Sequence, residues 1–116
     1  MTAPARPEVV TLCGSMRVFP RMLQVAAAET AAGAVVLAPF PIPDAHAGDG
    51  DVAAMLDDLH RRKIDMTDRV VVVTDATGSC GSATTAEVAY ARARGIPVHT
   101  RQVHEDARGT QGGDVW

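Results

Sequence analysis

The chain has 116 residues, of which 47% are hydrophobic and 22% charged, and its formal net charge is -3. A chain of this length can bury the core of one domain, and no apolar run approaches the roughly 20 residues of a membrane span. The acidic balance, with only two Phe, one Tyr and one Trp, leaves no basic surface or stacking platform for polymeric nucleic acid. These values predict a soluble one-domain protein that binds neither membranes nor nucleic acid polymers.

The cysteines and the N-terminus give no sign of secretion or of a metal site. The first residues, MTAPARPE, lack the apolar segment of a secretion signal, which favours a cytoplasmic location and reduced thiols. Cys13 and Cys80 have no CxxC partner and no metal-ligand spacing, so we interpret them as ordinary free cysteines. His46, with Asp44 and Asp49 nearby, has no second histidine at metal spacing. We therefore predict no metal and no cofactor.

The first half of the chain predicts a strand, a helix and a second strand. Residues 9–13, VVTLC, form a β-branched run that stops at Gly14, as a strand buried on both faces does. Apolar residues then recur at helical spacing over 17–32, and Gly33 follows as a C-cap. A second buried strand over 34–40 is broken by prolines, and a loop rich in proline, glycine and acidic residues follows it.

A second helix is predicted over residues 51–67. Its apolar stripe contains Val52, Met55, Leu56 and Leu59. Lys63 projects back onto this stripe, His60 lies at its edge, and Asp65 falls on the opposite side. The Lys63 side chain either extends past the edge of the core or reaches into a site at the helix end.

The last third of the chain completes the alternation of strands and helices. The segment RVVVVTD, residues 69–75, predicts a central parallel strand. A glycine-rich loop, a helix over 84–94 that ends at Gly95, and the strand IPVHT follow. The predicted fold is α/β, a flavodoxin- or Rossmann-like three-layer sandwich around a parallel sheet of about four to five strands. We expect residues 1–100 to form the single domain and residues 101–116 a polar C-terminal tail.

The loops after the first three strands should share one edge of the sheet, because right-handed crossovers place them there. Ligands of open parallel sheets bind at that edge. Two of the loops run Gly-Ser into a helix, where free N–H groups and the helix dipole favour phosphate, although the same pair is also ordinary turn and cap chemistry. The residues concerned are Gly14, Ser15, Gly81 and Ser82. Arg17 would add a charged contact, and Pro39 with Phe40 would offer an apolar wall for a base.

Glu87 fits two interpretations. The sequence Thr84-Thr85-Ala86-Glu87 has the spacing of a capping box, in which the Thr84 hydroxyl and the Glu87 carboxylate satisfy each other's backbone N–H groups. A carboxylate in the first turn of a helix at the ligand edge could instead attack a sugar carbon. Spacing alone favours the cap over the nucleophile.

Three segments of the chain carry a resemblance to a known family. The segments TLCGSMR, LHRRKIDMTDRVVVV and GSATTAEVAYARARGIPV together resemble the nucleoside 2-deoxyribosyltransferase-like superfamily, which includes nucleoside deoxyribosyltransferases and nucleoside 5′-monophosphate N-glycosidases. The resemblance covers residues 9–99. It implies that Glu87 attacks the anomeric carbon and expels the base, that the two Gly-Ser loops bind sugar or 5′-phosphate, and that the subunits form a homodimer or a larger homo-oligomer.

Two positions depart from the pattern of that superfamily. Catalytic members carry an aspartate that assists departure of the base, and here His60 lies nearest to its register, with Lys63 and Asp65 close by. Many deoxyribosyltransferases orient the glutamate with a tyrosine in the first loop, which residues 12–15 lack.

The sequence thus predicts a nucleotide-binding domain that cleaves the N-glycosidic bond of a nucleoside 5′-monophosphate or nucleoside. Glu87 would be the nucleophile, His60 or Asp65 would assist at the base, and Phe40 and Lys63 would join the loop residues in binding this small-molecule substrate. The alternatives are base exchange by a deoxyribosyltransferase and a nucleotide-binding module without catalysis. A flavin-binding protein is a third, which the few aromatic residues disfavour.

Overall fold

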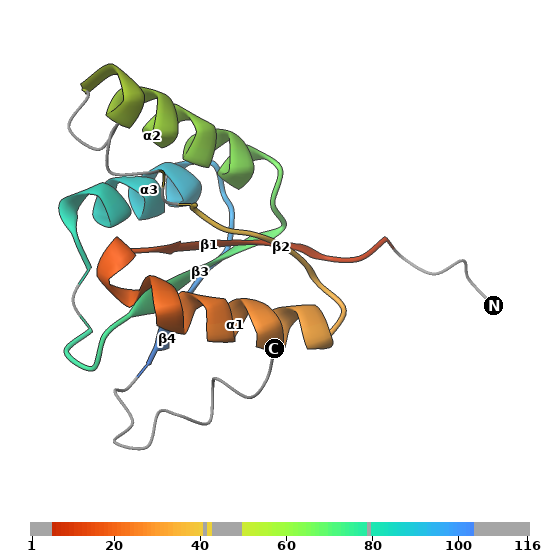
Figure 1. The fold of residues 1–116 in the computed structure, drawn as a ribbon. Helices are drawn as coiled ribbons and strands as arrows, with labels where there is room; N and C mark the ends of the chain where they lie inside the picture. Colours follow the sequence, from red (N-terminus) through yellow and green to blue (C-terminus); the bar gives the residue numbers. More distant parts are fainter. Residues whose placement is uncertain (1–5, 41, 43–49, 79, 104–116) are drawn as a thin grey trace.

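The structure, a computed structural model, describes residues 6–40, 42, 50–78 and 80–103. In these ranges four parallel strands form one sheet that is flanked by three α-helices (Figure 1). This arrangement confirms the predicted α/β class and the Rossmann- or flavodoxin-like sandwich. Among the described helices, none has the length and apolar character needed to cross a bilayer.

The order of the strands fixes where a ligand can bind. The strands are β1 (Val9–Gly14), β2 (Val35–Leu37), β3 (Arg69–Thr74) and β4 (Val98–Gln102). The helices are α1 (Phe19–Ala31), α2 (Gly50–Asp65) and α3 (Ser82–Ala93), and a short 3-10 turn, η1 (Met16–Val18), precedes α1. The sheet order is β2-β1-β3-β4, so the direction of strand addition reverses between β1 and β3. Open α/β sheets bind ligands beyond the carboxyl ends of the strands at such a point.

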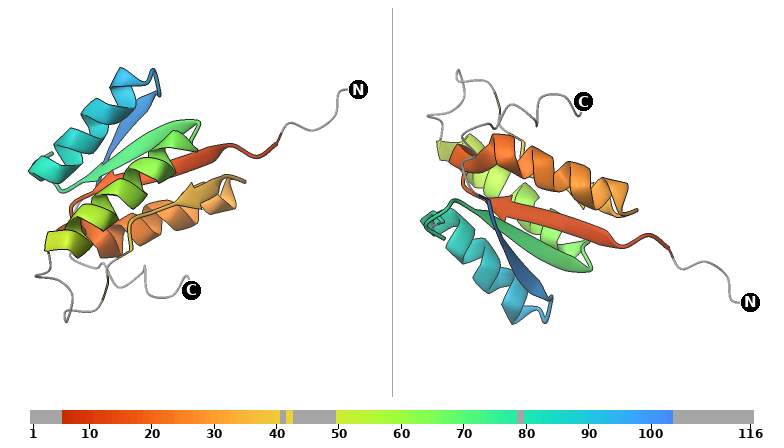
Figure 2. Two further views of the ribbon diagram at one scale, coloured as in Figure 1. Left: turned by 90° about the horizontal axis from the view of Figure 1, so that it is seen from above. Right: turned by 90° about the horizontal axis from the view of Figure 1, so that it is seen from below.

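The two faces of the sheet are covered differently (Figures 1 and 2). Helix α1 covers one face, while α2 and α3 lie on the other. Side chains alternate along β1, so Val10 and Leu12 pack with α1 while Thr11 and Cys13 face α2. The buried cluster under α1 is apolar and contains Val10, Leu12, Val18, Met22, Val25, Ala38, Val71 and Val73. The smaller cluster on the other face contains Cys13, Ile64, Val70, Val72 and Ala91.

Two strands differ in extent from their predictions. β2 pairs with β1 only from Val35 to Leu37, and Pro39 has no N–H with which to continue the ladder. β4 begins at Val98 and pairs with β3 as far as Gln102, so the predicted tail boundary at residue 100 falls inside this strand. The acidic loop with Asp44, His46 and Asp49 lies outside the described residues, as does the chain from residue 104 onward.

The first helix is divided into two parts. The 3-10 turn η1 precedes α1, and Pro20 stands in the first turn of α1, where its missing N–H is not needed. Gly33, with φ +98°, and Gly95, with φ +75°, both adopt the left-handed conformation expected of glycines that follow a helix.

The predicted apolar stripe of α2 is covered only in part, with Val52 and Leu56 half-buried. Met55 and Leu59 are 50% and 47% exposed, whereas His60 and Ile64 are buried. The physical reason lies in β1, which presents hydrogen-bonding groups to this helix: the Thr11 hydroxyl donates to the Lys63 carbonyl at 3.1 Å, and the Cys13 thiol lies against His60. These polar contacts accompany a rotation of α2 that differs from the one its apolar pattern predicts.

Candidate functional site

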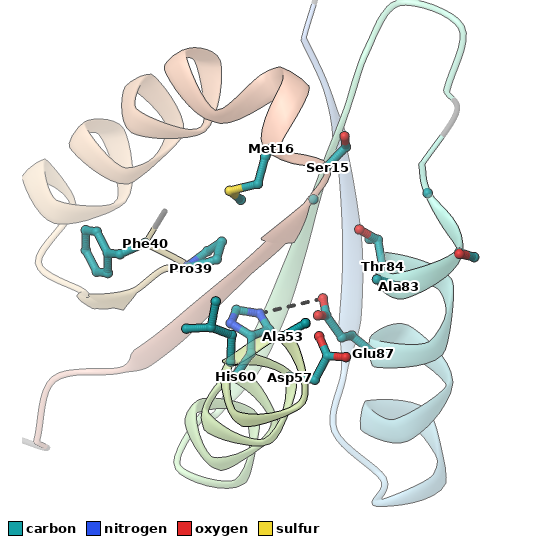
Figure 3. A pocket seen from close by; sticks show the side chains of 14 residues that line it. Ser15, Met16, Pro39, Phe40, Ala53, Asp57, His60, Ala83, Thr84 and Glu87 are labelled. Atoms are coloured by element: carbon teal, nitrogen blue, oxygen red, sulfur yellow. Dashed lines mark ion pairs between the residues drawn. The ribbon is translucent and has the colours of Figure 1, made fainter. Parts of the chain in front are cut away.

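A cavity of about 460 Å³ opens at the carboxyl ends of β1 and β3 (Figure 3). It is lined by residues 14–16 after β1, 39–40 after β2, Ala53, Leu56, Asp57 and His60 of α2, and 81–84 and Glu87 at the start of α3. A cavity of this size is typical of small-molecule sites. The sheet thus has its cavity at the edge that the strand order selects.

Glu87 does not close a capping box. Helix α3 begins at Ser82 with Gly81 as its N-cap, so Thr84 is the third helical residue and is itself buried. The prediction failed because the helix starts two residues earlier than the Thr84 pattern suggested. The Glu87 side chain points to the sheet side of α3 instead, where its Oε1 lies 3.7 Å from Nε2 of His60 (Figure 3).

The surroundings of Glu87 make its carboxyl group a weaker acid than an ordinary glutamate side chain. Burial raises its pKa to about 7, and the negative charge of Asp57 acts in the same direction. A hydrogen bond from the Cys13 thiol and the positive charge of Arg61 oppose these effects. The carboxyl group is therefore poised to exchange a proton near neutral pH, a property common among catalytic carboxyls.

His60 is buried and neutral at pH 7. Burial lowers its pKa to about 4, and the positive charge of Lys63 adds to that effect. Its 3.7 Å contact with Glu87 therefore joins a neutral imidazole to a carboxyl group and is no ion pair. Nδ1 of His60 has no hydrogen-bond partner among the described residues.

Two residues of the site, Cys13 and Asp57, were not predicted from the sequence to belong to it. Cys13 is fully buried, its Sγ lies 3.3 Å from Nε2 of His60, and burial together with the charge of Glu87 raises the pKa of the thiol. Asp57 is an exposed residue of α2 that lines the cavity next to Glu87 (Figure 3). Both had a usable signal: Cys13 shares its strand face with Thr11, and Asp57 stands one helical turn before His60.

The two Gly-Ser loops differ in what they offer an anion. Gly81 caps α3 with no side-chain hydrogen bond, and residues 81–84 of the first turn line the cavity. Ser15, by contrast, already accepts the N–H of Arg17 at 3.2 Å. Gly14 has a packing role of its own, because a Cβ there would lie 2.8 Å from the carbonyl oxygen of Val73. The start of α3 is the better anion site of the two.

Two predicted site residues lie away from the cavity. Arg17 contacts Asp75 at 3.3 Å and lines a separate hollow of about 320 Å³. Asp65 accepts a hydrogen bond from the Tyr90 hydroxyl at 2.7 Å and an ion pair from Arg94 at 3.0 Å, and it does not line the cavity. The structure therefore does not bring either residue to Glu87.

Phe40 lines the cavity on the side away from Glu87, and Lys63 lies next to Phe40 but does not line this cavity. Phe40 is 65% exposed and lines it, with its ring edge-on to Phe19. The Lys63 ammonium donates to the Ala38 carbonyl at 2.7 Å and lies 5.2 Å from the centre of the Phe40 ring. Both side chains border a smaller adjoining cavity of about 230 Å³, which His60 also lines. Lys63 therefore borders the adjoining cavity and not the main one, and its role in substrate binding stays a prediction.

Comparisons with known proteins do not assign this chain to a family. A scan against models of protein families found no match, and a search among curated proteins found none either.

Proposed function

We propose that this protein cleaves the N-glycosidic bond of a nucleoside 5′-monophosphate, with Glu87 as the nucleophile. One observation carries the proposal: the Glu87 carboxyl group lines the cavity at the ligand edge and is not engaged in capping its own helix. A carboxylate placed in this way can reach a sugar carbon, which a capping carboxylate cannot do without first leaving its bond.

The reaction would proceed in two displacements. The ionised Glu87 carboxylate attacks C1′, the bond from C1′ to the base nitrogen breaks, and the base leaves with the electron pair and gains a proton. Water then hydrolyses the glycosyl ester, which gives the free sugar phosphate and restores the carboxylate. If a second base replaced water in this step, the product would be an exchanged nucleotide.

The preference for a 5′-phosphate rests on the first turn of α3. Ser82 and Glu87 are five residues apart, a rise of about 7.5 Å along the helix, which is the scale of one ribose with its 5′-phosphate. The first-turn N–H groups of α3 have no side-chain cap and would bind the phosphate. Pro39 and Phe40 form apolar lining at the opposite wall, where the base would lie.

The group that assists departure of the base would be His60 or Asp57. Both line the cavity, whereas Asp65 is engaged with Tyr90 and Arg94. We no longer favour Asp65 for this role.

A second candidate function is nucleotide binding without catalysis. It is favoured by the histidine at position 60, which lies nearest to the register where the catalytic members that the chain resembles carry an aspartate.

The protein would also be a cytoplasmic homodimer, in which the exposed Met55 and Leu59 of α2 would be covered. Light scattering of the purified protein would test that assembly.

The assay for the main proposal uses a panel of substrates. The purified protein is incubated with ribo- and deoxyribonucleoside 5′-monophosphates and with the matching nucleosides, and free base is quantified by chromatography. We expect base release from at least one monophosphate and slower release from its nucleoside. A monophosphate that binds, as calorimetry would show, while no member of the panel releases base would favour the binding module instead.

A further inference from the structure

A thiol, an imidazole and a carboxyl group from three different elements meet beside the cavity. Cys13 belongs to β1, His60 to α2 and Glu87 to α3. The ligand atoms that they offer all lie within 4.8 Å of one another. These are the side chains that zinc sites use, and they converge although no spacing in the sequence marks them as a set.

Two of the three separations between the ligand atoms are close to those of a metal centre. Ligand atoms at about 2.3 Å for sulfur and about 2.0–2.1 Å for nitrogen or oxygen lie roughly 3.3–3.6 Å apart around a tetrahedral zinc ion. Here Sγ of Cys13 lies 3.3 Å from Nε2 of His60, which lies 3.7 Å from Oε1 of Glu87. The third pair, Cys13 Sγ and a carboxylate oxygen of Glu87, lies within 4.8 Å, so the Cys13 and Glu87 side chains would approach each other on enclosing one ion.

Charge and chemistry agree with a divalent cation. Cys13 and His60 are buried, the Glu87 side chain is 14% exposed, and burial disfavours the negative forms of the thiol and the carboxyl group. One divalent ion would offset both negative charges. The neutral imidazole of His60 needs to lose no proton before it binds. A thiolate with an imidazole suits Zn²⁺, whereas Mg²⁺ and Ca²⁺ prefer oxygen ligands only.

We propose that Cys13, His60 and Glu87 form a zinc-binding site of three protein ligands, with the fourth position open to the cavity. This departs from our prediction from the sequence, which expected no metal. The proposal does not rest on the proposed glycosidase function. It limits that function, because the Glu87 oxygen that binds the ion is not free to attack C1′, and zinc would therefore inhibit base release.

Cobalt provides a direct spectroscopic test. The full chain is treated with reductant and chelator, the chelator is removed, and Co²⁺ is added without any nucleotide. We expect one equivalent of Co²⁺ to produce the near-ultraviolet charge-transfer band of a thiolate ligand together with the strong visible bands of a tetrahedral site, and Zn²⁺ to displace both. Absence of the thiolate band from the wild-type protein at saturating Co²⁺ would overturn the proposal.

Two variants identify the ligands, and a third is the control. Cys13→Ser should remove the thiolate band, and Glu87→Gln should keep it while weakening Co²⁺ binding at least about 100-fold. Cys80→Ser changes the other cysteine, which lies outside the cluster, and should behave as the wild type. If Cys80→Ser removes the band, or Glu87→Gln binds as tightly as the wild type, the assignment is wrong. Thermal melts of each variant establish that it is folded.

The zinc proposal and the glycosidase proposal can fail independently of each other. If the protein binds the metal, but the metal-free protein releases base from none of the substrates, the zinc site stands and the glycosidase proposal is rejected. Base release that is indifferent to Zn²⁺ at saturating concentration would contradict the zinc site alone.

Discussion

The two faces of the sheet are built from the same strands but serve different purposes. Under α1 the buried cluster contains only apolar side chains. On the side of α2 and α3, the apolar side chains are accompanied by the buried Thr11, Cys13 and His60 and by the half-buried Glu87. His60 and Glu87 face each other there (Figure 3). Helix α1 also carries a half-buried carboxylate, Glu29, but that one forms an ion pair with Arg69 at 2.7 Å. Apolar packing stabilises the fold, whereas burying a carboxyl group costs stability unless the group is paired or hydrogen-bonded, and such carboxyl groups are common at functional sites. The difference places the polar groups of the candidate site on one face of the sheet.

The strongest test of this difference removes a side chain from the apolar face. Leu12 is completely buried under α1, and Leu12→Ala should lower the free energy of unfolding by about 2–5 kcal/mol, because a cavity remains where the side chain was. The measurement is urea denaturation followed by circular dichroism. Leu23→Ala, at a 37% exposed position of α1, is the matched control and should cost less than about 1 kcal/mol. Equal costs for the two variants would refute the assignment of the main core to this face.

On the polar face, replacing Glu87 should change the free energy of unfolding by less than Leu12→Ala does, and in the opposite direction. The pKa of Glu87 is raised in the folded protein, so the native state binds its proton more tightly than the unfolded state does. The contribution of Glu87 to stability therefore falls as pH rises from about 4.5 to about 7. The groups that act on it are the neutral Cys13 thiol of β1, through a hydrogen bond, and the charged Asp57 and Arg61 of α2, with His60 in contact.

Glu87→Gln removes this titration and should make the protein more stable than the wild type at pH 8. The expected gain is about 1–2 kcal/mol, allowing for partial exposure to the cavity. At pH 4.5 the two proteins should be nearly equal. Denaturation is followed at both pH values with chelator present, and the difference between the proteins isolates Glu87 from the separate titration of His60. A variant that is less stable than the wild type at both pH values would mean that the carboxyl group supports the fold.

The smallest effect concerns Lys63, which links α2 to the end of β2. Lys63→Met keeps most of the volume of the side chain but leaves the Ala38 carbonyl without its donor, which should cost about 0.5–1.5 kcal/mol. Arg62→Met, one residue earlier on the exposed side of α2, removes an ion pair with Asp58 at 3.5 Å and should cost only a few tenths of a kcal/mol. Thermal melts compare the two. If Arg62→Met is the more damaging variant, α2 does not pack as described.

Much of the fold could be predicted from the sequence because its signals are local. The run of valines in β3 and the glycines that end two of the helices each specify their structure within a few residues. The ligand edge followed from topology, which needs only the order of strands and helices. These predictions did not depend on how one helix is rotated against another.

The site was harder to predict, because it depends on helix rotation and on the exact start of a helix. The apolar pattern of α2 suggested a buried Met55 and Leu59, but contacts with β1 bury His60 instead. The Thr84 pattern suggested a cap, but α3 begins at Ser82, two residues before the predicted start at Thr84. Once both facts are known, the meeting of Cys13, His60 and Glu87 follows. Neither is encoded in the spacing of these residues along the chain.

The central claim is that Glu87 is the nucleophile of an N-glycosidase, and the most direct measurement compares base release by three proteins. In metal-free buffer near pH 8, the substrate that the wild type cleaves best is given to the wild type, to Glu87→Gln and to Glu8→Gln, whose glutamate lies outside the cavity and pairs with Arg69. We expect Glu87→Gln to lose at least about 1,000-fold in rate while remaining folded, and Glu8→Gln to keep the wild-type rate. Base release by folded Glu87→Gln at the wild-type rate would contradict the account.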